Sequence, residues 1–154
     1  MGSMEKEYSV EDQNRSIRVQ LDNDQALITG AGRSFHVSPR DRASALSNCP
    51  MELVLGALGA CIMLTLKAVA GQKGITLVQP DVRLGYTRNP DGETRFRVAL
   101  RLDDHLTDRE RKILYQSARI CEVGKILRGD VRIDYLLETQ SPEKGPETRQ
   151  YALG

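Results

Sequence analysis

Cys49, Cys61 and Cys121 carry the most reactive side chains in this chain of 154 residues. A thiol can act as a nucleophile, bind a metal ion or form a disulfide. Three cysteines without a CxxC spacing do not make a structural disulfide framework, and in a reducing compartment they are expected to be free, metal-bound or redox-active. Each thiol can also be a small apolar residue of the core, and the spacing alone leaves both interpretations open.

Cys61 lies within the apolar run Leu53–Leu66, eleven residues after Pro50. That is too far along a helix for the N-terminal dipole to ionise the thiol, so Cys61 needs a cation from another segment. The upstream candidates are Arg15, Arg18, Arg33, Arg40 and Arg42. Cys49 stands at the expected helix start, where a thiol ionises more easily, and an exposed regulatory thiol there is a further hypothesis. A continuous helix excludes a Cys49–Cys61 disulfide, whereas Cys61 and Cys121 could pair.

No other group of residues has the spacing of a known catalytic or metal site. His36 and His105 are isolated, and together with the scattered cysteines they do not match a zinc motif. The sequence holds no phosphate-binding loop, dinucleotide-binding glycine pattern or nucleophilic serine elbow. We therefore expect neither a metal ion nor a bound cofactor.

The residues around the cysteines predict the elements that must position them. Alternating apolar residues predict three short strands at 16–21, 25–29 and 34–38. A long helix follows, capped by Asn48 or Cys49 and ending near 71–74. A hairpin is predicted at 82–87 and 95–102 around the turn 89–92, and a helix at 108–120 after the capping box of Thr107 and Glu110. A short apolar helical turn after Cys121 and a last strand at 131–137 complete the order βββ–α–ββ–α–α–β.

This order predicts an α+β fold, with antiparallel sheets around a long buried central helix. We expect one domain over residues 16–138. Residues 1–15 are expected to be a tag remnant, Met1-Gly2-Ser3, and a mobile N-terminus, and residues 139–154 a weakly ordered tail rich in Pro, Glu and Gly. The all-apolar helix and the free face of the small sheet suggest that a second subunit covers them.

Charge and hydropathy exclude other classes of protein. The formal net charge is +1 and the chain has no Trp, which argues against a nucleic-acid binder. No signal peptide is recognised, and the 14-residue run 53–66 is shorter than a membrane span. We expect a cytoplasmic protein.

The segment Cys49–Cys61, CPMELVLGALGAC, resembles the central helix of the OsmC/Ohr family of thiol-dependent hydroperoxide reductases. In that family a proline opens the helix and a cysteine follows eleven residues later, as Pro50 and Cys61 do here. Cys121-Glu122-Val123 partly matches the family's second cysteine stretch, and the resemblance extends over residues 16–138. It implies an intertwined homodimer in which Cys61 is the peroxidatic and Cys121 the resolving thiol. The implied substrate is an organic hydroperoxide or hydrogen peroxide, and an external dithiol is the implied reductant.

The sequence also departs from the family. The peroxidases place a glutamate directly after the proline and pair it with an arginine from the first hairpin turn. Here that position is Met51, Glu52 is one residue later on the face opposite Cys61, and the turn 22–25 has no arginine. The Pro-Met-Glu form resembles a separate branch of the family. The alternative function is therefore a non-catalytic OsmC-like dimer that binds a hydrophobic small molecule at its interface.

Overall fold

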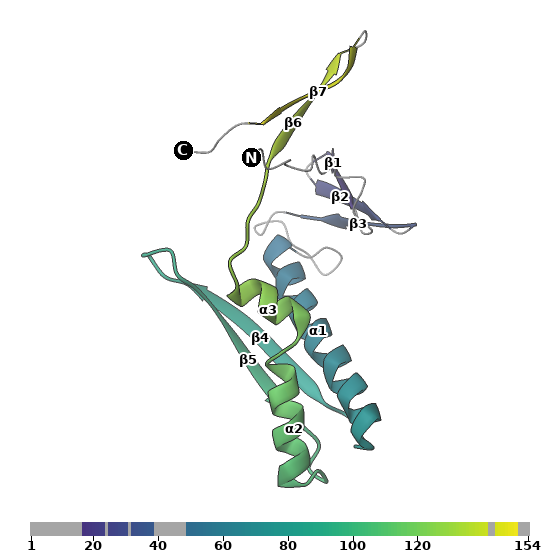
Figure 1. Ribbon diagram of the computed structural model, residues 1–154, viewed down its shortest axis with the longest axis vertical. Helices are drawn as coiled ribbons and strands as arrows, with labels where there is room; N and C mark the ends of the chain where they lie inside the picture. The colour runs from purple at the N-terminus through teal and green to yellow at the C-terminus, as the bar shows by residue number, and fades with distance from the viewer. Residues whose placement is uncertain (1–16, 24, 31, 39–48, 142–143, 151–154) are drawn as a thin grey trace, which may run out of the picture.

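The computed structural model describes residues 17–23, 25–30, 32–38, 49–141 and 144–150 (Figure 1). The N-terminal residues 1–15, expected to be a tag remnant and a mobile segment, lie outside this described part. The described elements follow the chain in the order β1 Arg18–Asp22, β2 Gln25–Gly30, β3 Arg33–Val37, α1 Pro50–Lys73, β4 Asp81–Arg88, β5 Thr94–Arg101, α2 Asp108–Ala118, α3 Glu122–Arg128, β6 Leu136–Ser141 and β7 Lys144–Gln150. The fold is α+β with antiparallel sheets and a central helix, as predicted.

The first three strands form one antiparallel sheet in the order β1-β2-β3. Arg18 pairs with Thr29 across β1 and β2, and Ala26 pairs with Val37 across β2 and β3. Asn23 has a φ of 55°, in the left-handed region that asparagine tolerates in tight turns. The three strands were predicted within two residues of these bounds.

Helix α1 begins and ends where its sequence signals lie. Cys49 is the N-cap, Pro50 is the first helical residue, and the Glu52 carboxylate accepts the N–H of Cys49 at 3.0 Å. Gly74 closes the helix in the left-handed conformation with a φ of 66°, and its N–H donates to the carbonyl of Ala70. The predicted helix is confirmed at both ends.

One face of α1 builds the core. Leu58, Ile62, Leu66 and Ala70 recur every fourth residue and are all buried. They join residues of α2 and the following turn in a single cluster, in which Leu66 and Leu114 are 0% exposed. By length and composition alone α1 could cross a membrane, but this face is packed against the rest of the chain, which identifies α1 as the core helix.

Strands β4 and β5 form a hairpin beside α1 (Figure 1). Its turn holds Gly92 at a φ of 92°; the N–H of Asn89 donates to the carbonyl of Glu93, and the carbonyl of Asn89 accepts the N–H of Gly92. Gly59 lets the helix approach β4 closely, because a Cβ there would lie 2.8 Å from Leu84 Cδ1. The predicted hairpin and turn are confirmed.

Helix α2 begins with the predicted capping box. The N–H of Thr107 donates to Glu110 Oε2 at 2.8 Å, and the N–H of Glu110 donates to Thr107 Oγ1 at 3.3 Å. Just before it, the Asp103 carboxylate accepts the N–H groups of Val78 and Gln79 at 2.8 and 2.9 Å. The loop before α2 is thereby tied to the segment that follows α1.

The last strand does not lie where the sequence predicted it. Residues 131–135 have no regular structure, and the strand β6 covers Leu136–Ser141. The alternation of Val131, Ile133 and Tyr135 predicted a strand, but these side chains are 57 to 67% exposed, and none of the described strands pairs with this segment. Strand β6 instead pairs with β7, which lies in the segment expected to be weakly ordered. The order of that tail stays a prediction.

Candidate functional site

The structure places the three cysteines at three different kinds of position. Cys61 lies in the middle of α1 and is partly exposed. Cys121 is the N-cap of α3 and is 2% exposed. Cys49 is the N-cap of α1 and is 4% exposed. All three are free thiols.

Helix α3 brings Cys61 and Cys121 together across sixty positions of sequence. It packs against α1, and the backbone N–H of Val123 donates to Cys61 Sγ at 3.4 Å. The Cys61 thiol is also close enough to Cys121 to raise the pKa of the Cys121 thiol. The two cysteines that the sequence singled out therefore share one site, at the contact between α1 and the first turn of α3.

The electrostatics of this site differ from those of a solvated thiol. Burial raises the pKa of Cys121 above its usual value of 9.0, and the neighbouring Cys61 thiol raises it further. The N–H of Gly124 and the charge of Arg128 oppose this shift. Cys121 makes no cap hydrogen bond of normal geometry, so the influence of Gly124 is that of a weak donor. The net result is a Cys121 thiol that holds its proton more strongly than a free cysteine.

Arg128 is the cation that sequence reasoning missed. It lies in the last turn of α3, where its Nε donates to the carbonyl of Gly124 at 3.1 Å and its Nη2 donates to the carbonyl of Arg119. These bonds join the end of α2 to α3 and hold the guanidinium near Cys121. The sequence signal was a basic residue in the last turn of a short helix that begins at a cysteine.

The upstream arginines do not include an identified partner for Cys61. Arg18 and Arg33 lie at strand positions in β1 and β3, opposite Thr29 and Gly30. The other three candidates, Arg15, Arg40 and Arg42, lie outside the described residues.

At the start of α1, Met51 and Glu52 are the residues in which the sequence departs from the peroxidases. Glu52 holds the N–H of its own N-cap rather than a catalytic group. Met51, in the position that follows the proline, lines a shallow pocket of about 430 Å³ with Tyr86, Arg88 and Thr94. Membership of a separate Pro-Met-Glu branch stays a prediction.

The hypothesis of an exposed regulatory thiol at Cys49 is wrong. Its side chain is buried rather than open to reagents. A disulfide between Cys49 and Cys61 is also excluded, since α1 runs without a break from Pro50 to Lys73.

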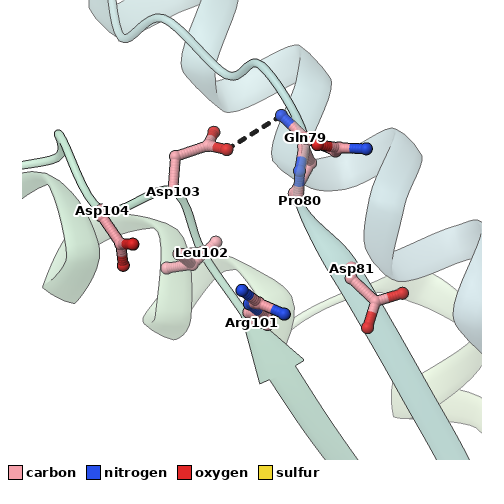
Figure 2. Close-up of a pocket in the computed structure, with 7 residues that line it drawn as sticks. All are labelled: Gln79, Pro80, Asp81, Arg101, Leu102, Asp103 and Asp104. Atoms are coloured by element: carbon pink, nitrogen blue, oxygen red, sulfur yellow. Dashed lines mark hydrogen bonds between the residues drawn. The ribbon is translucent and has the colours of Figure 1, made fainter.

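A second pocket of the described surface is lined by none of the three cysteines. It has a volume of about 600 Å³ and is lined by residues of the segments 79–81 and 101–104 (Figure 2). Figure 2 shows the Asp103 carboxylate turned toward the backbone of Gln79, so this side chain already has a structural partner.

Each histidine contacts another residue of the chain. His36 pairs with Asp22 at 2.8 Å, and the His105 ring bonds to the carbonyl of Thr76 at 3.0 Å. Among the described residues no group of three or more His, Cys, Asp or Glu side chains could hold a metal ion.

Solved structures with the same architecture include three with informative names. An OsmC-like protein from Mycoplasma pneumoniae superposes with a TM-score of 0.64 at 19% identity, over 77% of this chain and 89% of that chain. The organic hydroperoxide resistance protein OsmC from Legionella pneumophila gives 0.55 at 17% identity, over 76% and 90%. An organic hydroperoxide resistance protein from Elizabethkingia anophelis gives 0.56 at 16% identity, over 77% and 90%. At these identities the likeness shows a shared fold.

Sequence comparison gives the family. No curated protein matches the chain significantly. The family model described as "OsmC-like protein" matches residues 43–135, which is more than half of the chain and contains both Cys61 and Cys121. The predicted resemblance is confirmed, and the chain belongs to the OsmC-like protein family.

Proposed function

We propose that this protein reduces organic hydroperoxides or hydrogen peroxide with Cys61 and Cys121, as part of the defence against oxidative stress. The observation that carries the proposal is that the two thiols lie close together at the start of α3. There the N–H of Val123 donates to Cys61 Sγ at 3.4 Å. Family membership and the structural likeness to proteins named for organic hydroperoxide resistance support it.

Cys61 is the proposed peroxidatic thiol. Its side chain is partly exposed, so a peroxide can reach it, and a backbone N–H stabilises negative charge on its sulfur. The Cys61 thiolate attacks one oxygen of the peroxide, and the O–O bond breaks. The leaving alkoxide takes a proton and departs as an alcohol, or as water from hydrogen peroxide, and Cys61 becomes a sulfenic acid.

Cys121 is the proposed resolving thiol. It is almost fully buried and its pKa is raised, which makes it a poor first nucleophile in the resting protein. Once Cys61 is a sulfenic acid, the Cys121 sulfur attacks the Cys61 sulfur. An S–S bond forms, hydroxide takes the Cys121 proton, and water leaves. An external dithiol then reduces the disulfide, and a reducing cytoplasm suits that step.

The proposed active form is a homodimer. Several large apolar side chains are more than half exposed in the single chain, on α1 and on β1, and they include Leu64, Val19 and Leu21. Exposed apolar patches of this kind mark surfaces that another protein covers. A second copy that packs on α1 and on β1 would bury them.

Counting thiols after a peroxide pulse tests the function. The parent for this test is Cys49→Ser, which retains a good N-cap and leaves two cysteines. One equivalent of cumene hydroperoxide should remove both thiols of this parent. Cys61→Ala should keep its thiol, and Cys121→Ala should give a sulfenic acid that a dimedone probe labels. A parent that keeps both thiols over pH 6 to 9 contradicts the proposal.

The Cys49→Ser parent also distinguishes peroxide reduction from the alternative function, the binding of a hydrophobic small molecule. A non-catalytic dimer that binds a hydrophobic molecule would keep its thiols and carry a co-purified ligand. Native mass spectrometry detects that ligand as added mass, and a peroxide-reactive protein with the bare mass argues against it.

A further inference from the structure

Gly124 lies in the first turn of α3, three residues after Cys121, and its missing side chain leaves room for the resolving sulfur. A Cβ built at this position would lie 3.0 Å from Cys121 Sγ and 3.7 Å from Leu58 Cδ1. The first distance is shorter than a normal carbon–sulfur contact. Glycine is otherwise a poor residue inside a helix, so its presence here needs a physical reason.

We propose that Gly124 is a positioning residue for closure of the Cys61–Cys121 disulfide, because a side chain at 124 would crowd the Cys121 sulfur out of its place beside Cys61. The proposal rests on the proposed two-thiol function and deepens it. Cys121 is 2% exposed, so neighbouring atoms surround its sulfur and limit where it can move. An alanine at 124 requires that sulfur to move, because its Cβ would contact Leu58 at an ordinary distance but crowd Cys121 Sγ.

Displacement of the Cys121 sulfur acts on the closure step rather than on the first attack. Disulfide formation requires a narrow range of Cβ positions and of torsion about the S–S bond. A reaction within one molecule depends steeply on how its partners are placed. The attack of Cys61 on an outside reagent does not need the Cys121 sulfur. Gly124→Ala should therefore separate the two steps.

An aromatic disulfide follows both steps without any peroxide. In the Cys49→Ser parent, the Cys61 thiolate attacks 5,5′-dithiobis(2-nitrobenzoic acid), forms a mixed disulfide and releases one coloured thiolate. The Cys121 sulfur then attacks the Cys61 sulfur, loses its proton to solvent and releases the second coloured thiolate. Gly124→Ala should leave the first release unchanged and slow the second about tenfold. An unchanged second release overturns the proposal.

Gly71→Ala is the matched control. Gly71 is also a helical glycine, and a Cβ there meets no atom within 4 Å. This substitution should leave both releases at the parent rates, and slow closure in it would overturn the assignment to Gly124.

A second measurement keeps the proposal testable if Gly124→Ala weakens folding and slows both steps. The contact predicts that Gly124→Ala lowers the melting temperature when Cys121 is present and raises it in a Cys121→Ala background, where the helix gains a better residue and no sulfur is displaced. The same change in both backgrounds overturns the proposal. Failure of cumene hydroperoxide to oxidise the parent refutes only the proposed function, whereas unchanged closure in Gly124→Ala refutes only the role of Gly124.

Discussion

Leu64 and Leu66 lie two positions apart in α1 and offer a matched test of where the core is. Leu64 is 66% exposed and Leu66 is 0% exposed. Alanine has nearly the same helix propensity as leucine, so both substitutions leave the helix itself almost unchanged. The difference between Leu64→Ala and Leu66→Ala therefore reports packing alone.

The size of each effect follows from burial. Truncating a fully buried leucine removes its transfer free energy and leaves a cavity, and together these cost about 3–5 kcal/mol. For a domain of this size that loss lowers the melting temperature by roughly 10 °C. Leu64 buries only about a third of its side chain in the single chain, so its truncation costs about 0.5–1 kcal/mol.

Urea unfolding followed by circular dichroism measures both variants against the parent. A Leu66→Ala variant that loses less than about 1 kcal/mol would refute the assignment of Leu66 to the core. A dilution series tests the proposed homodimer at the same time. If a second copy covers Leu64, the deficit of Leu64→Ala exceeds the single-chain value and changes with protein concentration.

Three further predictions concern caps and charges. Thr107→Ala removes the side-chain acceptor of the α2 capping box and should lower stability by about 1 kcal/mol, which urea unfolding measures, with no loss if the cap is dispensable. Hydrogen bonds from two backbone N–H groups hold the pKa of Asp103 below its usual 3.8, so this carboxylate stabilises the fold above that pH and loses its contribution as the pH falls through its folded pKa. Asp103→Asn should therefore be less stable than the parent at pH 7 and differ less from it at pH 3, and a difference that does not depend on pH contradicts this. Cys61→Ala in the Cys49→Ser parent removes two of the causes that raise the pKa of Cys121, so that pKa should fall, and an ultraviolet titration of the thiolate that shows no shift contradicts the contact.

Local signals predicted most of the fold. The ends of α1 depend on Pro50 and Gly74, and the start of α2 depends on Thr107 and Glu110, all within one turn of the boundaries they set. The last strand was misplaced because alternation records only which side chains could share a face. Whether a strand forms depends on a partner strand. The partner here is β7, in the tail, and it pairs with residues from Leu136 onward rather than with residues 131–135.

The site was predicted only in part, for a related reason. Family resemblance singled out Cys61 and Cys121, but the residues that surround them depend on how α3 packs against α1. The N–H of Val123 belongs to the backbone and has no signature in the sequence. Arg128 and Gly124 are ordinary residue types in a short helix, and only the packed structure shows that both act on one sulfur.

The distance along the chain between the two sulfurs has a thermodynamic consequence. A bond between them would close a loop that holds the second half of α1, the β4–β5 hairpin and α2. In the chain-entropy description, a crosslink around a loop of about 60 residues restricts the unfolded chain by roughly 4 kcal/mol. Each turnover would thus alternate between a less stable and a more stable fold, and the reductant would act on the more stable of the two.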